Sequence, residues 1–189
     1  MVDRIPGGNE LLDAQKLIQK ANVSFGMTVA DLGCGGSGIF TLQSAKKVGD
    51  KGVVYAVDIL KSVLASVISK ARMQGINNVR TVWSNLEIYQ ATKIATASLD
   101  RALLINMLFQ SKKQKEIFQE TKRMMKREAM LLVVDWKPHG APFGPLEKDR
   151  IPPERIQAMA KDLGFEQLEA FEAGPFHYGF VFVNPSTGG

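Results

Sequence analysis

The stretch MTVADLGCGGSGIF at residues 27–40 decides the fold of this chain. A short apolar run leads to Asp31, and an apolar pattern of helical period follows a glycine cluster. The cluster consists of Gly33, Gly35, Gly36 and Gly38. A strand, a tight turn and a helix N-terminus in this order bring the backbone close to a nucleotide-like ligand in α/β proteins. The identity of that ligand therefore decides what the protein does.

The glycine spacing alone admits two classes of cofactor. Gly33-x-Gly35-x-x-Gly38 fits the dinucleotide fingerprint, and Asp58 lies twenty residues beyond Gly38, where an acid can contact a ribose hydroxyl. That arrangement suits a nicotinamide cofactor and S-adenosylmethionine equally. Further features of the chain have to separate the two.

Three such features favour S-adenosylmethionine. Asp31 would repel a pyrophosphate beside the glycines, but it tolerates a sulfonium and an ammonium group. The length of 189 residues leaves little room for the catalytic region of a dehydrogenase. Residues 165–172 and 176–183 have strand patterns and are joined by a tight turn. That turn predicts an antiparallel hairpin, which an all-parallel dinucleotide-binding sheet does not contain.

Five segments in order resemble the successive motifs of class I S-adenosylmethionine-dependent methyltransferases. The resemblance covers residues 10–183 and is nearest to small single-domain members similar to the ubiquinone and menaquinone biosynthesis type. The order and spacing of the segments are more specific than any one of them. The segments are VADLGCGGSG (29–38), VVYAVD (53–58), VWSNLE (82–87), LDRALLINMLF (99–109) and MLLVVDW (130–136).

The alternation of strand and helix patterns predicts an α/β fold with helices on both faces of a mostly parallel sheet. The resemblance adds a three-layer, Rossmann-like fold with seven strands in the order 3-2-1-4-5-7-6, strand seven being antiparallel. The length predicts a single domain over residues 1–189. Its parts are an N-terminal helix and arm (1–26), a core (27–183) and a frayed tail (184–189).

Apolar periodicity, capping residues and glycines predict the individual elements. Strands are expected at 27–31, 53–57, 79–83, 99–105 and 129–135, before the closing hairpin. Helices are expected at 10–21 with Asn9 as its cap, 38–48, 62–75 with Ser62 as its cap, 112–127 and 153–163. The prolines of residues 136–153 predict a loop. Residues 126–129 replace the Lys-Pro-Gly-Gly turn common in the family, so this turn must differ.

The resemblance implies that the glycine segment holds the methionine part of the cofactor. Gly33, Gly35 and Gly36 lack side chains, so that the backbone can approach it. Asp31 is expected close to the ammonium end. A serine stands where the family has its third glycine, which leaves open which residue contacts the cofactor: Gly36, Ser37 or Gly38.

The ends of the next strands are expected to hold the nucleoside. Asp58 would accept hydrogen bonds from the ribose hydroxyls, and Ile59 would pack on the adenine. Asn85 and Leu86 would border the adenine edge, where the family often has an acid whose role an amide oxygen can take. Asn106, after the fourth strand, would present backbone to the cofactor.

The methyl acceptor is expected over strands four and five, where four residues come to the same edge of the sheet. They are Met107, Phe109, Trp136 and Tyr178, the last because an antiparallel seventh strand begins at that edge.

Methyl transfer is an in-line displacement, for which the protein supplies alignment and a dry pocket. A hydroxyl acceptor would also need a base. The candidates are His139, His177 and Asp135.

A single-domain methyltransferase of this kind is expected to act on a small-molecule acceptor, and two alternatives stay open. The net charge is +5, and lysines gather in residues 112–127, either as a solvated helix face or as an RNA footprint. RNA methylation is therefore one alternative. A cofactor-binding protein without activity of its own is the other, because no clear catalytic constellation stands out.

The remaining features bound the environment. The chain has no run of eighteen apolar residues and begins without the apolar stretch of a signal peptide, which predicts a cytoplasmic protein without a membrane span. The single cysteine, Cys34, excludes an internal disulfide and a cysteine-rich zinc site, and no metal ligands are assigned. The acceptor, the atom methylated and the oligomeric state stay open.

Overall fold

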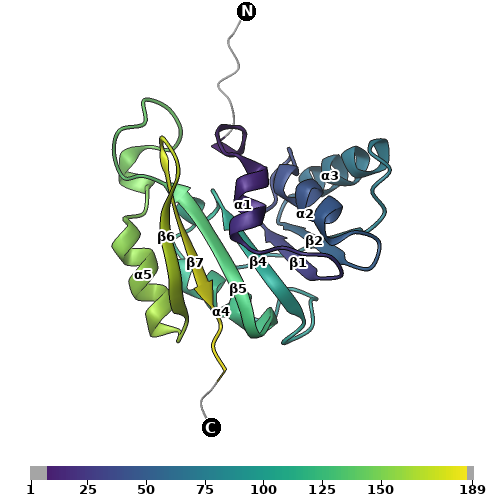
Figure 1. Ribbon diagram of the computed structural model, residues 1–189. Coiled ribbons are helices and arrows are strands. Elements are labelled where there is room, and N and C mark those ends of the chain that lie inside the picture. Colours follow the sequence, from purple (N-terminus) through teal and green to yellow (C-terminus); the bar gives the residue numbers. More distant parts are fainter. Residues whose placement is uncertain (1–7, 187–189) are drawn as a thin grey trace, which may run out of the picture.

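Seven apolar segments form one twisted sheet in the computed structural model, which describes residues 8–186 (Figure 1). The strand order is β3-β2-β1-β4-β5-β7-β6. Strand β7 runs antiparallel to both of its neighbours, and the other pairs are parallel, as predicted. The strands are β1 (Thr28–Leu32), β2 (Val53–Asp58), β3 (Val79–Trp83), β4 (Leu99–Ile105), β5 (Met125–Trp136), β6 (Glu166–Gly174) and β7 (His177–Val183).

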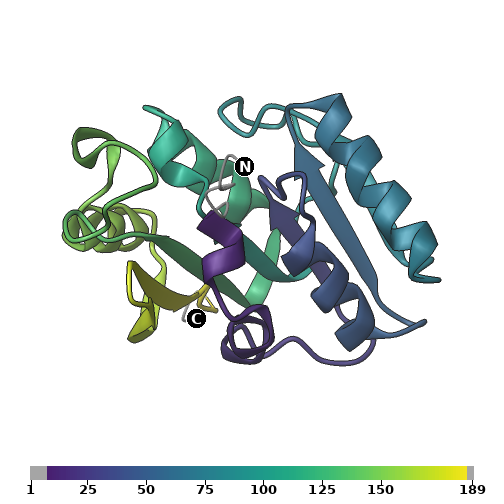
Figure 2. The same ribbon diagram turned by 90° about the horizontal axis from the view of Figure 1, so that it is seen from above.

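Helices cover both faces of this sheet and complete the three layers (Figure 2). Side chains of α1 and α2 pack with one face, α3 packs beside β2, and α4 and α5 pack on the opposite face. Three short 3-10 turns complete the described elements. The helices are α1 (Ala14–Lys20), α2 (Ile39–Val48), α3 (Lys61–Met73), α4 (Gln114–Met124) and α5 (Pro153–Asp162), and the turns are η1 (Gly8–Leu11), η2 (Leu108–Gln110) and η3 (Glu147–Asp149).

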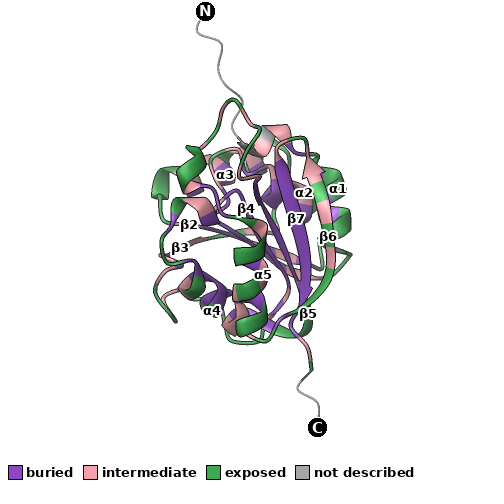
Figure 3. Ribbon diagram, turned by 90° about the vertical axis from the view of Figure 1, so that its left-hand side faces the viewer, coloured by how far each residue is buried: buried purple, intermediate pink, exposed green. Residues whose placement is uncertain are grey.

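The core lies on both sides of the central strands. Strand β7 is buried along its whole length, while α5 presents an exposed outer side (Figure 3). Phe118 of α4 and Phe182 of β7 belong to one apolar cluster, and Phe40 of α2 belongs to the other. Burying such side chains contributes roughly 1.5–3 kcal/mol each. The sheet is therefore a rigid base for the loops at its carboxyl edge.

Helices α1 and α3 start at residues other than those predicted, and α4 starts at Gln114 rather than residue 112. Helix α1 begins at Ala14 rather than residue 10, because the Asp13 carboxylate accepts a hydrogen bond from the Lys16 N–H (3.1 Å) and caps it. Helix α3 begins at Lys61, with Leu60 rather than Ser62 at the cap position. The Leu60 N–H donates to the Asp58 side chain (2.9 Å), which starts this helix earlier.

The end of the basic helix also differs from the prediction. The helix expected over 112–127 ends at Met124, and Met125 already pairs with Leu99 as the first residue of β5. Glu128 adopts a left-handed conformation (φ 59°), and the β4–β5 register shifts nearby. Strand pairing thus overrides the helical pattern of the last three residues.

The register at the carboxyl edge brings distant residues together. Asp135 lies opposite Tyr178 and Trp136 opposite His177 in the β5–β7 pair. The start of β7 therefore meets the end of β5, as predicted from the hairpin. No helix of residues 8–186 is long and apolar enough to cross a membrane. The outer parts of the predicted arm and tail, residues 1–7 and 187–189, lie outside the described residues.

Candidate active site

The glycine segment leaves β1 as a loop that bends sharply at the carboxyl edge. Gly33 (φ 81°) and Gly35 (φ 63°) both lie in the left-handed region that favours glycine. The N–H groups of Gly33 and Cys34 donate to the Val57 carbonyl (2.8 and 3.0 Å) and tie the loop to β2. A Cβ atom on Gly33 would overlap the Met107 side chain, so this position requires glycine.

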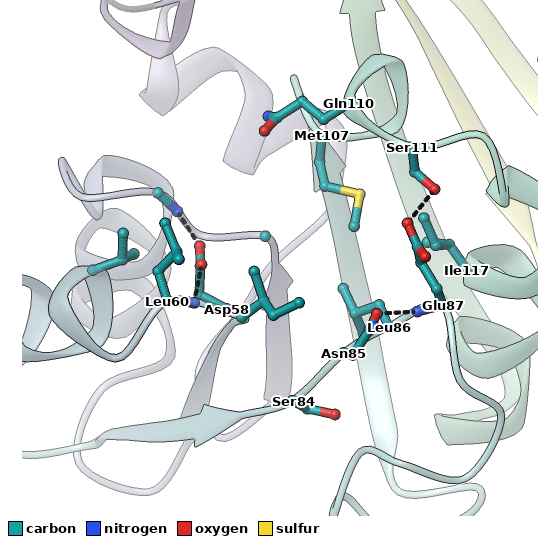
Figure 4. A pocket seen from close by; sticks show the side chains of 14 residues that line it. Asp58, Leu60, Ser84, Asn85, Leu86, Glu87, Met107, Gln110, Ser111 and Ile117 are labelled. Carbon is teal, nitrogen blue, oxygen red and sulfur yellow. Dashed lines mark hydrogen bonds between the residues drawn. The ribbon is translucent and has the colours of Figure 1, made fainter.

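A cavity of about 340 Å³ opens beside this loop, between the ends of β1 and β2 and the segment that follows β4 (Figure 4). Its volume lies at the lower end of the range of small-molecule sites, roughly 300–1,000 Å³. The lining includes predicted cofactor residues from both sides of the cavity. The lining residues are Gly33, Gly35, Asp58, Ile59, Leu60, Val63, Ser84, Asn85, Leu86, Glu87, Met107, Gln110, Ser111 and Ile117.

Asp58 is fixed against the wall of the cavity by two backbone groups. Its Oδ2 atom accepts a hydrogen bond from the Gly35 N–H (3.2 Å), and its Oδ1 atom accepts one from the Leu60 N–H (2.9 Å) (Figure 4). A carboxylate oxygen can accept more than one hydrogen bond. Asp58 therefore orients the loop and keeps acceptor capacity for a ligand.

Asp31 lies behind the glycine loop and outside the cavity lining. Its carboxylate is buried and accepts a hydrogen bond from the Thr41 hydroxyl of α2 (2.6 Å). Burial raises the pKa of Asp31 to about 6. The side chain thus joins the loop to α2 and adds negative potential below it.

The far wall of the cavity contains a carboxylate that sequence reasoning missed. The Asn85 side-chain oxygen accepts the Glu87 N–H (2.9 Å), and Ser111 donates to Glu87 Oε1 (2.6 Å) (Figure 4). Asn85 thus uses its oxygen in a local turn, and Glu87 brings an acid to this wall. Glu87 is the last residue of the VWSNLE motif, and this position is the feature of the sequence from which its role could have been predicted.

Asn106 lies beside the cavity rather than in its lining. Its amide donates to the Asn9 side-chain oxygen (3.0 Å), and its carbonyl accepts from Gln110, which lines the cavity (3.0 Å). The side-chain oxygen of Asn106 is buried and has no partner within residues 8–186. Asn9, predicted as a helix cap, instead lies 3.6 Å from where a Cβ atom of Gly35 would be.

Asp135, a candidate base toward the acceptor, is buried and does not line the cavity. Its carboxylate is fully buried and accepts hydrogen bonds from the N–H groups of Trp136 (2.8 Å) and Phe109 (3.3 Å). Burial raises the pKa of Asp135 to about 7. The side chain lies outside the cavity lining and holds the start of η2, which contains the half-buried Phe109.

His177 and Trp136 lie against each other at the end of β5, with ring centroids 4.3 Å apart. Both are buried, and neither ring nitrogen of His177 has a hydrogen-bond partner in the described part of the chain. Burial, with the nearby charges of Lys137 and Arg150, lowers the pKa of His177 to about 4. The imidazole is therefore neutral near pH 7.

Tyr178 and His139, two further acceptor candidates, differ in exposure. Tyr178 is buried, its hydroxyl donates to the Ile151 carbonyl (2.8 Å), and burial raises its pKa. The His139 side chain is 84% exposed and lies 3.3 Å from Glu147. His139 is thus on the surface while His177 is buried, although both belong to the same end of the sheet.

Comparison with known proteins places this chain in a family. A family model described as "Methyltransferase domain" matches residues 24–172. The chain belongs to this methyltransferase family. The seven-stranded order observed here is that of the class I, Rossmann-like methyltransferase fold.

Solved structures share this fold at low identity. A SAM-dependent methyltransferase from Aquifex aeolicus is 24% identical (TM-score 0.85), with 95% of this chain and 94% of that chain covered. An arsenic(III) S-adenosylmethionine methyltransferase from Chlamydomonas reinhardtii is 21% identical (TM-score 0.70; 98% and 67% covered). The [4+2]-cyclase SpnF is 14% identical (TM-score 0.77; 91% and 79% covered). Since the fold hosts more than one chemistry, the site must carry the functional argument.

One feature on the acceptor side of this methyltransferase could not be seen in the sequence. The buried Arg150 side chain donates hydrogen bonds to four carbonyls of the loop that follows β5. They belong to Lys137 (3.4 Å), Ala141 (3.1 Å), Phe143 (3.2 Å) and Pro145 (3.0 Å). The proline-rich loop is thus a folded structure that packs Phe143 against Trp136.

Proposed function

We propose that this methyltransferase binds S-adenosylmethionine in the cavity beside the glycine loop and methylates a small-molecule acceptor. The observation that carries the proposal is the lining itself. It joins side-chain-free backbone at Gly33 and Gly35, the oriented carboxylate of Asp58 and apolar surface from Ile59 and Leu86.

The residues present fit the parts of the cofactor. Gly33 and Gly35 line the cavity without side chains and would accommodate the methionine part. Asp58 would accept hydrogen bonds from the ribose hydroxyls, and Ile59 and Leu86 would enclose the adenine. When bound, the cofactor supplies a methyl group activated by a positively charged sulfur.

Other groups near the cavity suit a cation. Asn106 retains a buried side-chain oxygen without a partner in residues 8–186, which could accept a hydrogen bond from the ammonium group. Asp31 and Asp58 add negative charge around the glycine loop. Such a potential favours a sulfonium cofactor over a pyrophosphate. Gly36 lies outside the lining, so we assign the direct contacts to the other two glycines.

For the acceptor, we propose that Met107 and Phe109 border the reacting end and that Trp136 and Tyr178 shape its outer wall. Met107 is the one of these four that lines the cavity. His177 stays a candidate base toward a hydroxyl acceptor because neither ring nitrogen has a partner within residues 8–186. Its pKa of about 4 makes it a weak proton acceptor, so we expect it to contribute little to deprotonation. Asp135 is occupied by backbone N–H groups, and we assign it to holding η2 in place.

A small molecule is favoured over RNA because three lysines of the basic segment (residues 112–127) have partners. Lys112 pairs with Asp149 (3.4 Å), Lys126 pairs with Asp100 (2.7 Å), and Lys122 donates to carbonyls at the end of α5. Partnered lysines contribute less to a phosphate footprint.

Calorimetric titration with S-adenosylmethionine, S-adenosylhomocysteine and NADH tests the proposal. We expect micromolar binding of the first two, weakened at least about tenfold in Asp58→Ala, because this variant loses the acceptor for the ribose. Asp162→Ala, at the exposed end of α5, is the matched control and should bind normally. Binding of NADH alone would overturn the proposal. Cofactor binding without turnover of any acceptor would favour the non-catalytic alternative.

A further inference from the structure

We propose that Lys70, together with Ser66, is a positioning residue that ties the glycine loop to α3 and thereby sets the affinity for the cofactor. This inference rests on the proposed function, because it assigns a role toward S-adenosylmethionine. It concerns residues that do not line the cavity and that the motif pattern did not single out.

The contact consists of three hydrogen bonds to two carbonyls of the loop. The Lys70 ammonium donates to the carbonyl oxygens of Gly36 (2.6 Å) and Ser37 (3.3 Å). The Ser66 hydroxyl donates to the same Gly36 oxygen (3.1 Å). Ser66 and Lys70 are four residues apart and so lie on the same face of α3.

Close packing accompanies these bonds. Val67, between the two donors in sequence, is fully buried, and its Cγ2 atom would lie only 3.0 Å from a Cβ atom on Gly38. Gly38 has a φ of 61° and precedes the first residue of α2. Helix α3 therefore holds the end of the loop by packing at Gly38 and its middle by hydrogen bonds.

Besides this contact, a turn hydrogen bond from the Gly38 N–H to the Gly35 carbonyl (3.1 Å) spans the middle of the loop, and it leaves the Gly36 and Ser37 carbonyls to Lys70 and Ser66. A Cβ atom on Gly36 would meet nothing within 4 Å, so this side of the residue faces open space. Glycine loses more conformational freedom on ordering than any other residue. Fixing the Gly36 and Ser37 carbonyls on the α3 side orders the loop before a ligand arrives, which raises affinity through preorganisation.

These hydrogen bonds from Lys70 and Ser66, which we call the α3 clamp, also affect the residues that line the cavity. Gly35 directly precedes Gly36, and its N–H is held by Asp58 (3.2 Å). The loop is thus fixed at Gly35 from the end of β2 and at Gly36 from α3. When the second restraint is lost, Gly33 and Gly35 should sample positions that bind the cofactor less well.

Four variants test this assignment. Lys70→Met keeps most of the aliphatic stem and removes the donors, whereas Lys70→Arg keeps donors at the end of a long stem. Ser66→Ala removes one hydrogen bond and provides a second test of the same contact if Lys70→Met does not fold. Arg72→Met is the matched control, because Arg72 is an exposed cation on the same helix, two residues further on.

We expect Lys70→Met to weaken S-adenosylhomocysteine binding about tenfold in calorimetry, Ser66→Ala about threefold, and Arg72→Met not at all. Lys70→Arg should recover most of the affinity. Wild-type affinity in Lys70→Met, or an equal loss in Arg72→Met, would overturn the assignment.

Amide hydrogen exchange of the ligand-free protein separates this inference from the proposed function. Exchange at residues 34–38 should be faster in Lys70→Met than in the wild type and unchanged in Arg72→Met. Unchanged exchange in Lys70→Met would overturn the α3 clamp. If the wild type bound no S-adenosylhomocysteine, the proposed function would fail, and the exchange rates would still decide whether Lys70 orders the loop.

Discussion

The two halves of the carboxyl edge use their predicted residues in opposite ways. Around β1 and β2 the residues lie open to a cavity, as Gly33, Asp58 and Ile59 do. Around β5 and β7 they are buried and bonded to one another or to backbone, as Asp135 and Tyr178 are. After the functions proposed above, we call the first the cofactor half and the second the acceptor half.

The difference has a physical cause. The cofactor half works through backbone atoms and a short segment, so its geometry follows from glycines and one carboxylate. The acceptor half works through side chains from separate strands and from a loop folded by Arg150. Substitutions in the two halves should consequently have separable effects on ligand binding and on stability.

The largest effect is expected for Gly33→Ala. The new Cβ would overlap Met107, and alanine disfavours a φ of 81°. We expect S-adenosylhomocysteine binding to fall by about a hundredfold and the free energy of unfolding by about 2–4 kcal/mol. Gly36→Ala is the control, because its Cβ would meet open space at a φ outside the left-handed region. Equal losses in both variants would contradict the role given to Gly33.

Arg150→Met should disturb the acceptor half alone. Removing the guanidinium leaves four loop carbonyls without their donor, so we expect the unfolding free energy to fall by about 2 kcal/mol. Amide exchange over residues 137–149 should quicken. Calorimetry should find S-adenosylhomocysteine affinity within about twofold of the wild type. A large loss of affinity would show that the two halves are coupled.

Asp135→Asn should change the pH dependence of stability. Because burial raises the pKa of Asp135 from 3.8 to about 7, the folded protein binds this proton more tightly than the unfolded chain does. The wild type therefore loses stability as the pH rises from about 4 to about 7. Denaturant unfolding should show the difference moving in favour of Asn by on the order of 4 kcal/mol between about pH 4 and 8, because each unit of pKa shift corresponds to about 1.4 kcal/mol. A constant difference would mean that the carboxyl is not perturbed.

The smallest effect is expected for Tyr178→Phe. This variant loses the hydrogen bond to the Ile151 carbonyl (2.8 Å), which should cost about 1 kcal/mol of unfolding free energy. Tyr89→Phe, at an exposed tyrosine, is the control and should be neutral. Binding of S-adenosylhomocysteine should be unaffected by either. If Tyr178→Phe weakened that binding, the tyrosine would belong to the cofactor half.

The sequence predicted the sheet well because its strands are marked by local apolar patterns and glycine turns. The strand order and the antiparallel β7 followed from the family resemblance together with the hairpin signal at 173–175. The boundaries at Ala14 and Met125 could not be predicted from these patterns, because capping by Asp13 and pairing with Leu99 override helical periodicity.

The lining of the candidate site could be predicted where its residues lie close together in the sequence. The glycines, Asp58 and the Asn85 motif lie next to strand ends, where a short pattern fixes their place. Asn9, Lys70 and Arg150 could not be predicted, because each acts on backbone or side chains far away in the sequence. The burial of single side chains could not be predicted either, because nothing in the sequence pattern distinguishes exposed His139 from buried His177.

Mapping S-adenosylhomocysteine onto the protein by amide chemical shifts in nuclear magnetic resonance tests the central claim most directly. Saturating ligand should perturb amides at residues 33–38, 58–60, 84–87 and 107–110, which border the cavity and its glycine loop. Residues 137–149 should change little. Perturbations centred on 137–149 and the start of β7, with the glycine loop silent, would contradict the assignment of the cofactor to the first half of the sheet.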